Sequence, residues 1–81
     1  MSADIDIDDT LDVQGASCPI PVVKTKQAID DLDAGDVLEV IATDSGSLSD
    51  IDGWAGATDG VELLKQVEDG DVYRHYVKKT E

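Results

Sequence analysis

The chain has 81 residues, which is room for one hydrophobic core, so we expect a single domain over residues 10–79 behind an acidic, flexible leader at 1–9. Its formal charge of -13, from 19 acidic residues against 6 Lys and Arg, would destabilise a compact state through self-repulsion at low ionic strength. Because molar salt shortens the Debye length to about 3 Å, this composition favours a salt-rich cytosol, as in a halophilic microbe.

The composition also excludes several locations and cofactors. The single cysteine cannot form an internal disulfide, and the acidic N-terminus does not resemble a signal peptide. No stretch approaches the ~20 apolar residues of a membrane helix, so a cytoplasmic protein without membrane contact is expected. One cysteine and one histidine cannot build a structural zinc site, and no metal, other cofactor or direct nucleic-acid contact is expected.

Hydrophobic periodicity predicts a strand, a helix and a second strand in the first half of the chain. Leu11 and Val13 alternate with polar residues in a strand over 8–13. Apolar residues at 3.6-residue spacing predict a helix over 21–32. The mostly apolar run at 37–42 is typical of a buried strand. The residues expected to face inward from the helix are Val22, Thr25, Ala28, Ile29 and Leu32.

The second half of the chain predicts a helix and a hairpin. Ser47 and Asp50 form the pattern of a capping box, in which the serine precedes a helix that places Trp54 at the edge of the core. An Asp-Gly turn joins strands over 61–68 and 72–79. Because a strand–helix–strand unit crosses over right-handedly, both helices should cover one face of a four-stranded mixed sheet. The predicted fold is therefore a two-layer α/β (α+β) sandwich.

The stretch Gly-Ala-Ser-Cys-Pro-Ile-Pro that follows the first strand carries the candidate reactive group. Gly15 ends the strand. Pro19 and Pro21 fix their own φ angles and push the residues before them, Cys18 and Ile20, away from helical geometry. Their missing N–H groups cost nothing at the start of a helix, where N–H groups lack partners anyway. This pattern predicts that the cysteine is held in extended backbone just outside the helix.

The position of Cys18 favours its thiolate form. Unpaired amides over 22–24 and the helix dipole supply partial positive charge, and such fields lower a cysteine pKa from ~8.5 to between ~3.5 and ~7.5. Lys24 and Lys26 could stabilise the thiolate or contact a partner, the alternative being a solvated helix face. His75 is expected at the surface in preference to acting as a base for the cysteine.

A lone thiolate is suited to accepting a group from one protein and passing it to another. With no second cysteine, no internal disulfide can cycle, whereas a persulfide needs no resolving cysteine in the same chain. Two other functions stay open from the residues alone. One is a regulatory or protein-interaction module in which Cys18 is inert and buried, and the other is a single-cysteine redox sensor.

Several segments resemble the TusA/SirA-like sulfur carriers, and the resemblance spans about residues 10–79. The matching segments begin with Leu11-Asp12-Val13-x-Gly15-x-x-Cys18-Pro19-Ile20-Pro21-Val22-Val23-Lys24-Thr25-Lys26 and continue at 35–40, 43–51 and 73–79.

The resemblance implies a two-layer sandwich with a persulfide on Cys18. The sulfur would come from a cysteine desulfurase or another sulfur donor protein and go to a downstream sulfur-acceptor protein. Uses within the family include tRNA thiolation, molybdenum-cofactor synthesis and sulfur oxidation. Pro19 and Pro21 match helix-stabilising prolines of the family, and Lys26 matches a position that is often basic. Between the glycine and the cysteine the family usually has bulkier and more polar or basic residues than the Ala-Ser found here.

Overall fold

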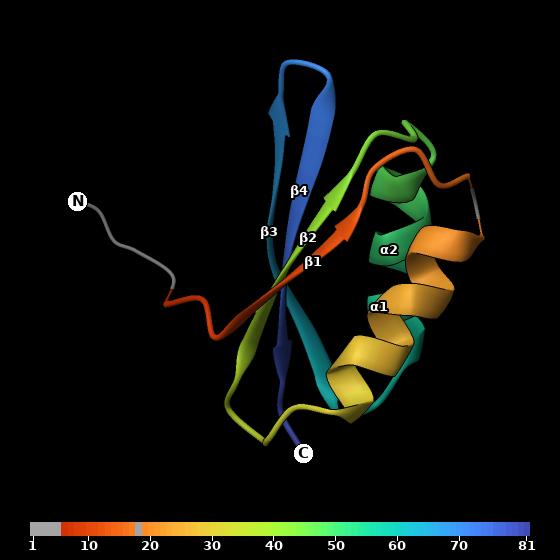
Figure 1. Cartoon of the computed structure of the whole chain (residues 1–81). Helices are drawn as coiled ribbons and strands as arrows, with labels where there is room; N and C mark the ends of the chain where they lie inside the picture. Colours follow the sequence, from red (N-terminus) through yellow and green to blue (C-terminus); the bar gives the residue numbers. More distant parts are fainter. Residues whose placement is uncertain (1–5, 18) are drawn as a thin grey trace.

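The computed structural model describes residues 6–17 and 19–81, and these contain the predicted order of elements (Figure 1). Residues 1–5 of the predicted leader lie outside the described residues. Asp8 already pairs with the second strand, since its amide donates to the Val37 carbonyl at 2.9 Å. Neither helix has the length and hydropathy to span a membrane within the described ranges. The elements are β1 (Asp9–Val13), α1 (Ile20–Asp30), β2 (Val37–Ala42), α2 (Ser47–Ala57), β3 (Val61–Asp69) and β4 (Val72–Lys79).

The four strands form a mixed sheet in the order β1-β2-β4-β3. β1 and β2 are parallel because α1 carries the chain back between them, and β4 pairs antiparallel with both β2 and β3. Both helices lie on one face of the sheet (Figure 1), which confirms the predicted two-layer sandwich. A β-bulge between Leu63 and Lys65 interrupts the register of β3 against β4.

α1 begins one residue before its predicted start and ends two residues before its predicted end. The expectation that Pro21 keeps Ile20 out of helical geometry is wrong, because Ile20 is the first helical residue. Its amide donates to the Ser17 carbonyl at 2.9 Å, and this bond outweighs the steric bias against a helical residue before proline. At the other end, the Lys79 ammonium donates to the Leu32 carbonyl at 2.7 Å and satisfies a carbonyl beyond the last turn.

The predicted capping box at the start of α2 is wrong. The helix begins at Ser47 itself, and the residue before it is Gly46, which has no side chain to cap with. The Ser47 hydroxyl is fully buried and lies 3.1 Å from Nε2 of His75, so it bonds across the core. The Asp44 carboxylate instead accepts a hydrogen bond from the Gly46 amide at 3.0 Å and tightens the turn before the helix.

An aliphatic core fills the space between the sheet and the helices. Trp54 packs against this core while half-buried, at the edge where the sequence placed it. Burial of a large aliphatic side chain contributes about 1.5–3 kcal/mol, so these positions hold the two layers together. The core side chains with no exposed surface are Leu38, Val40, Ala42, Ile51 and Val77.

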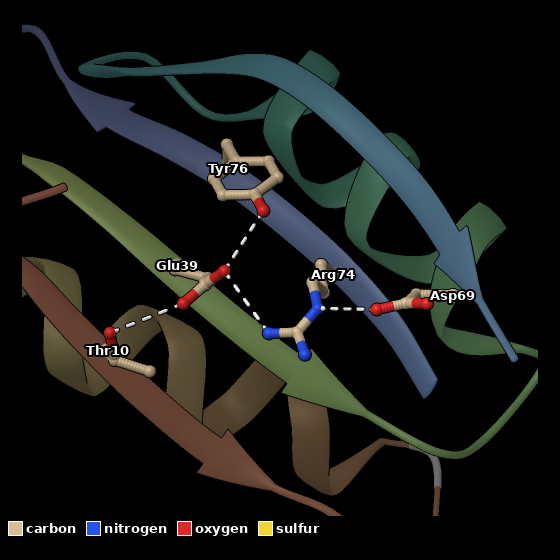
Figure 2. A network of polar contacts seen from close by, with 5 residues as sticks. All are labelled: Thr10, Glu39, Asp69, Arg74 and Tyr76. Atoms are coloured by element: carbon tan, nitrogen blue, oxygen red, sulfur yellow. Dashed lines mark hydrogen bonds and ion pairs between the residues drawn. The ribbon is translucent and has the colours of Figure 1, made fainter. Parts of the chain in front are cut away.

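On the other face of the sheet, polar side chains from β1, β2 and β4 and from the end of β3 form a network of contacts (Figure 2). Glu39 accepts hydrogen bonds from the Tyr76 hydroxyl at 3.0 Å and the Thr10 hydroxyl at 3.4 Å. It also forms a 3.4 Å ion pair with Arg74, which reaches Asp69 at 3.4 Å. Burial, together with the hydrogen bond to Glu39, raises the pKa of Tyr76 above its ordinary value. These contacts leave the Glu39 side chain 13% exposed on the face that neither helix of the described residues covers.

Candidate functional site

The candidate site lies at the edge of the sheet where β1 and β2 end. Because these neighbouring strands are parallel, their carboxyl ends meet, and the loops that follow them lie close together. A hydrogen bond joins the two loops, in which the Gly15 amide donates to the Thr43 hydroxyl oxygen at 2.8 Å. The first loop leads into α1 and the second into α2, so both helices begin at this edge.

Gly15 lets the chain turn away from β1. Its φ angle of 84° lies in the left-handed region, where a residue with a side chain is strained. The Ala16 amide donates to the Val13 carbonyl at 3.1 Å and closes the turn. The structure therefore gives this glycine the turn-forming position that the sequence predicts for it.

Cys18 lies outside the described residues, and in the sequence it directly precedes Pro19. Pro19 is the residue before the first turn of α1, and it is exposed, as is Ser17 on the other side of the cysteine. Pro21 is buried in the first turn of the helix, where its lack of an N–H group leaves no donor unsatisfied. The two prolines thus flank the point at which the chain enters α1.

The prediction of unpaired amides over 22–24 is wrong for two of its three residues. The Val23 amide donates to the Pro19 carbonyl at 3.1 Å. The Lys24 amide is paired with the Ile20 carbonyl by the regular pattern of a helix that begins at Ile20. These two amides therefore have carbonyl partners and are not open donors at the start of the helix.

The two lysines predicted near the thiol have different surroundings. Lys24 is exposed on α1, about one turn from its start. Lys26 lines a groove of about 210 Å³ with Trp54 and Lys79, between the C-terminal halves of the two helices. At 1.5 Å of rise per residue, Lys26 lies about 9 Å along the axis from Ile20. The structure therefore places Lys24 closer to the start of the helix than Lys26.

Two apolar side chains are exposed beside the start of α1. Ile20 and Val23 each have 44% of their surface exposed. Residues three or four apart are neighbours on a helix surface, so these two share a side of α1 with Lys24 and Gln27. The result is a small apolar surface with a cation beside it, next to the cysteine in the sequence.

His75 is buried, so the expectation of a surface histidine is wrong. Its Nε2 lies 3.1 Å from the Ser47 hydroxyl, and its Nδ1 lies 3.0 Å from the side-chain nitrogen of Gln66. Burial lowers the pKa of His75 below its ordinary value, which favours the neutral ring. Because both ring nitrogens have partners inside the core, His75 is not available as a base for the cysteine.

Sequence reasoning also missed the contribution of Thr43. The available signal was its position directly after β2, since loops that follow neighbouring parallel strands meet at one edge.

Over residues 6–17 and 19–81, no group of three or more His, Cys, Asp or Glu side chains could hold a metal ion.

Together, fold and site define a small two-layer α+β protein with its one cysteine in the segment that enters the first helix. The chain belongs to the TusA family, whose model, described as sulfurtransferase TusA, matches residues 9–79. This match confirms the family resemblance identified from the residues around Cys18.

Relatives of the chain carry names from the same class. A protein of Halobacterium salinarum, named as a proposed sulfur carrier protein, is 72% identical over 80 residues, which cover 99% of each chain. Sulfur carrier protein TusA of Allochromatium vinosum is 40% identical over 75 residues, 93% of this chain and 97% of that protein. The crystal structure of a SirA-like protein from Desulfitobacterium hafniense has a TM-score of 0.71 at 29% identity, covering 90% of this chain and 99% of that one. These relatives support a sulfur-carrier role.

Proposed function

We propose that the protein carries sulfane sulfur as a persulfide on Cys18, which it accepts from a donor protein and passes to an acceptor protein. One observation carries the proposal: the single cysteine directly precedes the N-terminus of α1, inside the segment that the TusA family model matches. The exposure of its neighbours Ser17 and Pro19 supports access by another protein. A thiol must stay reduced between transfers, so we also propose that the protein acts in the cytoplasm.

Both transfer steps are thiol exchange at sulfur. In loading, the Cys18 thiolate attacks the terminal sulfur of a persulfide on the donor protein. A bond forms between that sulfur and the Cys18 Sγ, the bond to the donor cysteine breaks, and the donor leaves as a thiolate. In delivery, a thiolate of the acceptor protein attacks the same sulfur, and Cys18 leaves as a thiolate. Neither step consumes an oxidant or a reductant.

Donor and acceptor must reach the same sulfur, so they use overlapping surfaces in turn. The exposed pair Ile20 and Val23 supplies apolar contact area beside the start of α1. Lys24 adds one of the six Lys and Arg side chains of a strongly acidic chain. We propose that a cysteine desulfurase or another sulfur donor protein docks on this surface, and that the acceptor protein replaces it.

The loading step can be tested by intact mass. The full chain, incubated with an active cysteine desulfurase and cysteine, should gain the mass of one sulfur atom, and dithiothreitol should remove it. The variant Cys18→Ser should gain nothing under the same conditions. Alanine release confirms that the desulfurase is active. If neither the active desulfurase nor polysulfide adds sulfur to Cys18, the carrier function is wrong.

The same protein and its Cys18 variants distinguish the two alternative functions, an interaction module and a redox sensor. A Cys18 that resists alkylation in the folded protein, with a normal fold in Cys18→Ala, would favour an interaction module. Rapid sulfenic-acid formation by dilute peroxide without sulfur loading would favour a redox sensor. Proteins trapped as mixed disulfides with Cys18 would identify the pathway, because enzymes of tRNA thiolation, molybdenum-cofactor synthesis and sulfur oxidation are distinct.

A further inference from the structure

We propose that Thr43 is a positioning residue for the turn that leads to Cys18, through the hydrogen bond that its hydroxyl accepts from Gly15. The inference rests on the proposed function, because it gives Thr43 a part in the sulfur-carrier site. The bond from the Gly15 amide to the Thr43 Oγ1 is 2.8 Å long and joins residues 28 positions apart. It connects the loop after β1 to the loop after β2.

Thr43 is held in place by anchored residues on both sides of it in the chain. It follows Ala42, which is fully buried at the end of β2. The loop beyond it is closed where the Ser47 amide donates to the Asp44 carbonyl at 2.9 Å. The Ser47 hydroxyl is in turn 3.1 Å from Nε2 of His75 inside the core. The backbone of Thr43 therefore lies between two buried anchors, although its own side chain is exposed.

The turn at Gly15 has much less support of its own. Nothing lies within 4 Å of the position that a Cβ would occupy at Gly15, so that side of the turn is open. The amides of Gln14 and Ala16 donate to the Asp12 carboxylate at 2.9 Å and the Val13 carbonyl at 3.1 Å, which are local bonds. Local bonds shape a turn without fixing its orientation to the rest of the fold. The bond to Thr43 supplies that orientation together with the partly buried Ala16, which packs against the core.

The orientation of this turn bears on the thiol because Cys18 lies between the turn and the start of α1. The field of a helix N-terminus acts within its first turn, so its effect on a thiolate depends on where the thiol is held. Loss of the Thr43 hydroxyl should therefore raise the pH at which the thiol becomes reactive.

The test compares Thr43→Val with Thr43→Ser. Valine keeps the shape of threonine without the hydroxyl, whereas serine keeps the hydroxyl, and neither leaves a cavity at an exposed position. The rate of alkylation of Cys18 by iodoacetamide is measured as a function of pH on the full chain. We expect Thr43→Val to be about threefold slower or more near pH 7, with its pH profile displaced upward, and Thr43→Ser to match wild type. Equal profiles for wild type and Thr43→Val overturn the proposal, as does an equal change in both variants.

A second measurement needs no variant. In the wild-type protein, the temperature coefficient of the Gly15 amide proton chemical shift, measured by NMR, should be that of a hydrogen-bonded amide. A value typical of a solvent-exposed amide overturns the proposal, even if Thr43→Val does not fold. Alkylation requires no sulfur donor, so the two proposals fail separately. A chain that never loads sulfur but shows the valine effect loses the carrier function alone. A chain that loads sulfur with equal alkylation profiles loses the role of Thr43 alone.

Discussion

The hydrogen bonds around His75 determine where its ring proton lies. The side-chain nitrogen of Gln66 donates to the Leu48 carbonyl at 2.8 Å and lies 3.0 Å from Nδ1, so Nδ1 accepts. The ring proton is then on Nε2, which donates to the Ser47 hydroxyl oxygen at 3.1 Å. A second proton on Nδ1 would face another donor. The neutral ring is therefore the form that fits this part of the core.

This arrangement predicts a loss of stability in mild acid. Because burial lowers the pKa of His75 in the folded protein, the unfolded chain binds the proton at a higher pH than the folded chain does. The free energy of unfolding should therefore fall as the pH drops from about 6.5 to the lowered folded pKa, by at most ~1.4 kcal/mol per pH unit. At pH values well above 6.5 both states are neutral, and His75 adds no pH dependence. Urea unfolding at about pH 5 and pH 7.5 measures the effect.

The control is His75→Gln, which keeps a donor and an acceptor but does not titrate. Carboxylates titrate in both proteins, so their contribution cancels in the difference between them. The variant should lose less stability than wild type between the two pH values, whatever its stability at the higher one. Equal losses in the two proteins would mean that the buried ring is not the group responsible.

These contacts could not be predicted from local sequence. Ser47 and Asp50 match a helix-capping pattern, yet the serine hydroxyl bonds a histidine 28 residues away. Alternation along the last strand leaves the face of His75 undetermined until the pairing is known, when it falls on the same face as the buried Val77. Thr43 likewise acquires its role only once β1 and β2 are known to be parallel neighbours.

At the scale of the element, α1 has large apolar residues on its exposed side as well as on its buried side. Pro21, Thr25 and Ile29 are buried against the core, as the 3.6-residue periodicity predicts for the last two. Ile20 and Val23 stay 44% exposed although both are large and apolar. Apolar side chains that are exposed together next to the segment that contains Cys18 are the expected composition of the proposed docking surface.

We predict that Ile20→Ser combined with Val23→Ser slows sulfur loading from a cysteine desulfurase about fivefold or more. Truncation of an interface anchor costs about 1 kcal/mol or more, and neither side chain is needed by the core. Loading from polysulfide requires no docking and should keep its wild-type rate.

The matched control for this experiment is Leu64→Ser, at a leucine that is 37% exposed on β3. It should leave both loading rates unchanged. A docking surface on α1 would be contradicted by an equal loss in the control. It would also be contradicted if the double variant lost its polysulfide rate to the same extent.

The type and order of the elements could be predicted because they follow from local periodicity. β2 spans the predicted residues 37–42, whereas α1 differs from its prediction at both ends. Helix ends depend on contacts from elsewhere, such as the bond from the Lys79 ammonium to the Leu32 carbonyl, which joins residues 47 positions apart. For the candidate site, the turn at Gly15 could be predicted from its own residues, while the surroundings of Lys26 required the packing of the two helices.

At the scale of the whole molecule, the net charge predicts a strong dependence on salt. With 19 acidic residues against 6 Lys and Arg, self-repulsion opposes the compact state, and salt screens it. Thermal unfolding should therefore move to higher temperature as KCl rises from about 0.1 M to about 2 M. Such a result would also support the prediction that the protein works in concentrated salt.

A variant with fewer acids separates screening from other effects of salt. Asp31, Asp52, Asp59 and Asp71 are exposed, so replacement of all four by Asn removes charge without disturbing the core. This variant should unfold at a higher temperature than wild type in dilute KCl and gain less from added salt. An unchanged gain would show that repulsion among the carboxylates is not the cause.

The β-bulge in β3 bears on the resistance of the protein to aggregation at high salt concentration. Repulsion between two acidic copies extends only about 3 Å at molar salt, too short a range to keep them apart. β3 is an edge strand, whose unpaired N–H and C=O groups could accept a strand from a neighbouring molecule. The bulge between Leu63 and Lys65 interrupts the regular backbone spacing that such an addition needs, and dissolved ions do not alter backbone geometry. At this edge of the sheet, resistance to strand addition at high salt would then depend on the shape of β3, whereas in dilute buffer charge protects the molecule.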